Sequence, residues 1–138
     1  MKEEKENIEE LGYMQQLYEQ QYRLLTDSIN EKMNALNELS IVQKALENSK
    51  LMQQREVLSG IGAGVFAKGS ISANESFIVG VEGGFFVEMP VEQAKEYIAK
   101  EIEKSSAEVN SMMSDRKKIE SSLVEITKKI ESISGRNV

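Results

Sequence analysis

Two long apolar seams, separated by a short insert rich in glycine and phenylalanine, constrain most strongly how this chain can fold. Within each seam, apolar residues recur at alternating steps of three and four, which is the spacing of a coiled coil. The first seam comprises Ile8, Leu11, Gln15, Tyr18, Tyr22, Leu25, Ile29, Lys32, Leu36, Leu39, Gln43 and Leu46. The second comprises Ile98, Ile102, Ser105, Val109, Met112, Arg116, Ile119, Leu123, Ile126, Ile130 and Ile133. Neither flank contains an internal glycine or proline beyond Gly12 and Gly135, so each is predicted to form one long helix.

The short insert predicts that the two helices pair antiparallel, as a long helical hairpin. One pairing places Leu25 opposite Leu123 along the seam. The same pairing places Lys32 opposite Arg116, and we expect both side chains of this like-charge layer to reach water.

The insert contains most of the chain's nine glycines and all four phenylalanines. Short runs of β-branched and aromatic residues alternate there with glycine turns, which predicts two consecutive β-hairpins. The dipeptide Gly83-Gly84 supplies the positive φ angles that a tight hairpin turn requires. Pro90 ends the last predicted strand, where the second long helix is expected to follow.

The predicted fold class is α+β, mostly α: a long antiparallel coiled-coil hairpin with a four-stranded insert. The N-terminal helix is assigned to residues 1–56, the two hairpins to 57–90 and the C-terminal helix to 91–138. Four short strands leave two edges open and cannot bury their own apolar side chains. We therefore expect the inserts of several subunits to assemble into a shared sheet or a β-barrel. The apolar side chains of the insert that most need such a partner are Phe66, Ile78, Val81, Phe86 and Val87.

Composition argues against several classes of function. The chain has no histidine and no cysteine, so the commonest general base, metal ligand and thiol nucleophile are missing, and we expect no enzyme and no metal site. The formal net charge of −6 argues against a nucleic-acid partner. No apolar run reaches the roughly 20 residues that span a bilayer. No apolar segment follows the charged residues 1–6, so we expect a cytoplasmic protein.

The glycine cluster at residues 60–64 does not match a phosphate-binding loop. Such a loop needs a lysine directly before serine or threonine, whereas Lys68 here precedes Gly69. We interpret these residues as turn glycines and expect no cofactor.

Apolar residues also lie off the seam near the free end of the first helix: Tyr13, Met14 and Leu17. Two interpretations remain open. These side chains either extend the coiled coil or contact another subunit, or they form an adaptable apolar surface for a partner, to which methionine is well suited.

The whole chain resembles the prefoldin family, and specifically its archaeal-type α class, which carries two hairpins between its helices. The resemblance is most specific over residues 56–69 and 85–89, and it continues into residues 92–97 at the start of the second helix. It implies a hexamer of two α and four β subunits, with a double β-barrel from which the coiled coils hang.

The resemblance further implies an ATP-independent holdase, which binds unfolded polypeptides at the coiled-coil tips and delivers them to a group II chaperonin. Client contact is carried over to Ile8, Leu11, Met14, Leu17, Ile126, Ile130 and Ile133. The resemblance likewise implies that the expected interface residues are Phe66, Phe77, Ile78, Val79, Phe85, Phe86 and Val87. The alternative is a structural coiled-coil module, or a filament-forming subunit, that binds no client.

Overall fold

The computed structural model describes residues 2–52, 56–71 and 76–136. The elements follow in the order α1 (Lys2–Glu47), α2 (Ser49–Met52), β1 (Glu56–Gly62), β2 (Val65–Ser70), β3 (Ser76–Val81), β4 (Phe85–Pro90) and α3 (Val91–Arg136). The chain forms two compact units. The first combines Met1–Ala35 with Ser105–Val138, and the second comprises Leu36–Lys104.

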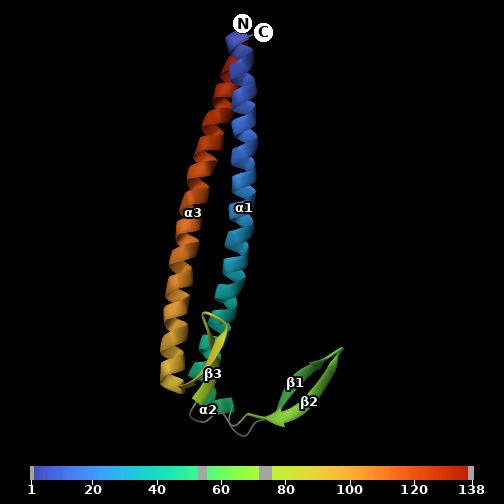
Figure 1. Cartoon of the computed structure of the whole chain (residues 1–138), viewed down its shortest axis with the longest axis vertical. Coiled ribbons are helices and arrows are strands. Elements are labelled where there is room, and N and C mark those ends of the chain that lie inside the picture. Colours follow the sequence, from blue (N-terminus) through green and yellow to red (C-terminus); the bar gives the residue numbers. More distant parts are fainter. Residues whose placement is uncertain (1, 53–55, 72–75, 137–138) are drawn as a thin grey trace. The chain divides into compact units, whose positions relative to one another are not determined.

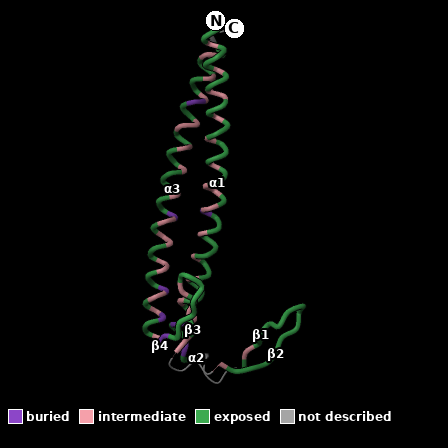
Figure 2. Tube along the Cα trace, in the orientation of Figure 1, coloured by how far each residue is buried: buried purple, intermediate pink, exposed green. Residues whose placement is uncertain are grey.

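The first unit is a pair of helical segments, one from α1 and one from α3. They run side by side, and the N-terminal end of α1 lies next to the C-terminal end of α3 (Figure 1). Every predicted seam position in this unit is buried or half-buried, which confirms the seams. The most buried are Ile29, Val109 and Ile126, at 2%, 4% and 6% exposure. Most other residues of the pair are exposed (Figure 2), as expected for a core only one seam wide.

The two segments pair in a register different from the predicted one. Lys32 forms an ion pair with Glu108, not a like-charge layer with Arg116. The Arg116 Nη1 atom donates a hydrogen bond to Thr26 Oγ1 at 3.3 Å, and the guanidinium group lies 5.7 Å from the centre of the Tyr22 ring. The prediction of two facing cations was therefore wrong. The observed register gives each cation a partner, which lowers the cost of keeping charge at a half-buried seam.

The second unit holds the C-terminal part of α1, the N-terminal part of α3 and both hairpins. Its core consists of Leu46, Met89, Ala94 and Ile98, all of which are buried. The partly buried side chains packed against this core are Leu39, Phe77, Val79, Val81, Tyr97 and Ile102. One face of the β3–β4 hairpin is therefore covered by helices of its own chain.

The α1 helix ends before the expected boundary at residue 56. The Asn48 backbone and side-chain nitrogens both donate to the Lys44 carbonyl oxygen, at 3.1 and 3.0 Å. A one-turn helix, α2, follows at once, and its Ser49 is buried at 6% exposure.

The insert forms two separate two-stranded antiparallel sheets, β1–β2 and β3–β4, and not one four-stranded sheet. Both follow the same plan, because each places a phenylalanine directly opposite a glycine: Phe66 faces Gly60, and Phe86 faces Gly80. The β1–β2 turn contains Ala63 at a φ of 50°, and a bulge precedes it.

Candidate functional site

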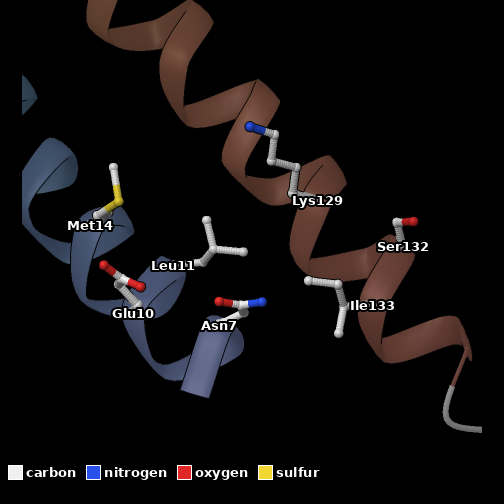
Figure 3. Close-up of a pocket in the computed structure, with 7 residues that line it drawn as sticks. All are labelled: Asn7, Glu10, Leu11, Met14, Lys129, Ser132 and Ile133. Carbon is white, nitrogen blue, oxygen red and sulfur yellow. The ribbon is translucent and has the colours of Figure 1, made fainter. Parts of the chain in front are cut away.

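An apolar groove opens in the first unit, where the N-terminal end of α1 meets the C-terminal end of α3. Its volume is about 420 Å³. It is lined by Asn7, Glu10, Leu11, Met14, Lys129, Ser132 and Ile133. Figure 3 shows that the Leu11 and Ile133 side chains extend toward each other across the groove. The surface is apolar in the middle and polar at its borders.

The helical repeat explains how these side chains come together. Leu11 and Ile133 are seam residues and are half-buried, because each faces the other helix. Met14 lies three residues after Leu11, on the same side of α1, and is 37% exposed. A flexible thioether beside two aliphatic side chains can adapt to partners of different shape.

The charged residues at the groove have different surroundings. The Lys129 Nζ atom lies 3.9 Å from Glu125 Oε1, one turn earlier on α3. Among the side chains that the structure describes, no ion pair involves Glu10. The two groups lie on different helices, so the groove has one carboxylate wall and one ammonium wall.

The predicted client-contact residues differ in their accessibility. The groove brings together Leu11, Met14 and Ile133. Leu17 is 40% exposed but does not line the groove, and Ile8 and Ile130 are half-buried. Ile126 is only 6% exposed, because its seam position turns it toward α1. It is therefore not available at the surface of the helix pair, contrary to the expectation from its position near the chain end.

Sequence reasoning missed the polar border of the groove, which consists of Asn7, Glu10, Lys129 and Ser132. Charged and amide residues occur throughout both helices, so none of these four is distinctive in the sequence. Which of them meet across the groove depends on the register of the helices, and that register was predicted incorrectly.

The hairpins present a second candidate surface. Five of the expected interface residues are exposed: Phe66, Ile78, Phe85, Phe86 and Val87, at 62%, 74%, 70%, 76% and 41%. The other two, Phe77 and Val79, pack against the core of their own unit. They are therefore not free at the surface, because they alternate with Ile78 and face the opposite side of β3. Leu58, Ile61 and Val65 of the first hairpin are also exposed, at 65%, 72% and 56%, although they are not among the expected interface residues.

Within the described residues, no group of three or more acidic, histidine or cysteine side chains could hold a metal ion. None of the described helices combines the length and apolar character needed to cross a membrane.

Comparison with known proteins relates the chain to one family. The family model described as "Prefoldin subunit" matches residues 14–136. The chain is 35% identical over 103 residues to prefoldin subunit alpha 1 of Thermococcus kodakarensis, covering 74% of this chain and 70% of that protein. It is 26% identical over 135 residues to prefoldin subunit alpha of Pyrococcus horikoshii, covering 96% and 91%.

A solved structure shares the fold. It is a filamentous prefoldin from Methanocaldococcus jannaschii, with a TM-score of 0.58 and 21% identity, and the match covers 88% of this chain and 95% of that one. At this level of identity, the match shows that the two chains share a fold. Taken with the match to the family and to its alpha subunits, it shows that the chain belongs to the prefoldin family as an alpha-type subunit.

Proposed function

We propose that this chain is a subunit of an ATP-independent holdase of the cytoplasm, which binds unfolded polypeptides in the apolar groove and delivers them to a group II chaperonin. Family membership implies a chaperone-type subunit. The observation that carries the finer proposal is the groove itself, where Leu11, Met14 and Ile133 meet at an accessible end of the helix pair. Unfolded chains expose apolar side chains, and an exposed apolar surface is suited to bind them without a fixed sequence.

Substitution of Met14 tests this proposal with a matched control. Met14 and Met113 are almost equally exposed, at 37% and 39%, but only Met14 lines the groove. We expect Met14→Gln to weaken suppression of aggregation of a denatured client, as measured by light scattering. Met113→Gln should leave suppression unchanged. Circular dichroism should show equal helix content in the two variants. Equal suppression by both variants would place client binding elsewhere.

We further propose that the exposed hairpin faces assemble this chain with β-class prefoldin subunits, as two α with four β. Oligomeric assembly with other subunits is indicated by the family and by the fold neighbour. The exposed side chains of Phe66, Phe86 and Ile78 support this proposal, because apolar groups of that size gain from burial against a partner.

Mass photometry of the chain mixed with a β-class subunit tests this assembly. Phe86→Ser should prevent the complex from forming, because it removes an exposed aromatic side chain from β4. Tyr13→Ser is a suitable control, since Tyr13 is also an exposed aromatic residue, at 63% against 76% for Phe86, but lies on α1, outside the hairpins. A complex that forms normally with Phe86→Ser contradicts an interface on this face.

A filament-forming subunit is the second candidate, and one observation favours it. The β1–β2 hairpin is a two-stranded sheet that exposes apolar side chains, which could pair with another copy of the chain. The neighbour in fold is itself described as a filamentous prefoldin. Electron microscopy of the purified chain separates the two candidates. Long polymers with no effect on client aggregation would favour the structural role, and discrete particles that suppress aggregation would favour the holdase.

A further inference from the structure

The Glu10 carboxylate at the border of the groove has no ionic partner among the described side chains. This negative charge affects which polypeptide segments the groove can bind. Glu10 lies next to Leu11, on the α1 side of the groove. On the opposite side, the Lys129 ammonium group is already 3.9 Å from the Glu125 carboxylate. The positive wall is therefore partly compensated within α3, whereas the negative wall is not.

The surrounding charge on α1 has the same sign as Glu10. From residue 2 to residue 10, the helix carries five glutamates and two lysines. Glu3 and Glu4 lie in the first turn, where the helix dipole favours negative charge. Glu9 and Glu10 lie beyond that turn, so the dipole compensates them less. The α1 segment beside the groove therefore carries a net negative charge.

We propose that the groove prefers polypeptide segments in which an apolar residue is flanked by lysine or arginine. This inference rests on the proposed client-binding function and specifies the class of client segment. The apolar residue occupies the space between Leu11, Met14 and Ile133, and the flanking cation lies against the Glu10 carboxylate. The apolar contact contributes affinity but does not depend on the exact sequence of the segment. The Glu10 carboxylate distinguishes among equally apolar segments by the charge of their flanking residues.

Two fluorescent peptides test this preference on the full-length chain. They share one unstructured apolar centre and differ only in their flanks, which are lysine in one and glutamate in the other. Fluorescence anisotropy should show that the lysine-flanked peptide binds about two- to fivefold more tightly, the range expected for one exposed charge pair. The difference should shrink at high salt, because exposed charges are screened.

Variants of α1 make the test specific to the groove. Glu10→Lys should reverse or abolish the preference, and Glu10→Gln should reduce it. Glu31→Lys is the matched control: it makes the same charge change at an exposed position of α1 outside the groove, and should leave the preference intact.

The outcomes separate this inference from the proposed function. Equal affinity for the two peptides, tighter binding of the glutamate-flanked peptide, or equal effects of Glu10→Lys and Glu31→Lys would each overturn the preference and leave client binding standing. Failure to bind either peptide would overturn the groove as a client site, and the inference with it.

Discussion

Lys32 of α1 and Glu108 of α3 form an ion pair across the helix pair of the first unit, and each side chain is 40% exposed. Lys32 occupies a seam position that an apolar residue would normally fill. It therefore contributes to the choice of one register, because a shifted pairing would leave a half-buried charge without its partner.

Charge reversal at this pair is expected to destabilise the helix pair. Lys32→Glu or Glu108→Lys alone should lower the free energy of unfolding by about 1 kcal/mol, a value reduced for the partial exposure of both groups. The double variant should recover most of this loss. Thermal unfolding followed by circular dichroism measures the effect. The same charge reversals at Lys100 and Glu96 provide the control. These side chains are 73% and 68% exposed, so each reversal should lower the free energy of unfolding by less than the reversals at Lys32 and Glu108. If the double variant is less stable than both single variants, the ion pair does not set the register.

Truncation of Ile29 tests how much of the stability comes from the seam. Ile29 is 2% exposed, so Ile29→Ala should lower the free energy of unfolding by about 2–3 kcal/mol, because it removes buried apolar surface and leaves a cavity. Ile41 of the same helix is 67% exposed, and Ile41→Ala should change the stability by less than about 0.5 kcal/mol. Urea unfolding of the two variants measures both values. Similar losses for both isoleucines would contradict a stability that depends on this seam.

The glycines opposite the two hairpin phenylalanines should respond differently to the same substitution. A Cβ atom at residue 80 would lie 3.3 Å from Cε1 of Phe86, whereas at residue 60 it would lie 3.7 Å from Cε1 of Phe66. Gly80→Ala therefore displaces an exposed ring on the proposed assembly face, and should weaken assembly severalfold. A Cβ atom at residue 60 makes only ordinary van der Waals contacts. Gly60→Ala should therefore raise the free energy of unfolding by about 0.4–1 kcal/mol, because alanine lowers the conformational entropy of the unfolded chain. Mass photometry and thermal unfolding of the two variants check these outcomes. Assembly that is weakened equally by both substitutions would contradict the role given to the Phe86 ring.

The sequence was sufficient to predict the two helices and the hairpins, because their signals are local. The seam residues repeat with a helical period, and the turn at Gly83-Gly84 requires positive φ angles that glycine adopts easily. The register of the helix pair was not predictable in the same way. Matching apolar residues allows several neighbouring pairings, and polar partners across the helix pair, such as Glu108 for Lys32 and Thr26 for Arg116, distinguish them.

The candidate groove was predictable only in part, for the same physical reason. Leu11 and Met14 belong to the apolar pattern near the start of the chain, and the sequence singles them out. Glu10 and Lys129 become neighbours of the groove only when the two helices are correctly aligned. For Ile126, in contrast, the sequence position near the chain end was misleading. The heptad pattern places this residue in the buried seam, and it is not accessible to a client.

Site-specific photo-crosslinking tests the central claim most directly. A photoreactive amino acid replaces Met14 in one sample and Met113 in another, two positions with nearly equal exposure in the same unit. Each sample is mixed with a denatured client and irradiated. The groove account predicts strong crosslinks to the client from position 14 and few from position 113. Equal crosslinking from both positions, or stronger crosslinking from position 113, would contradict it.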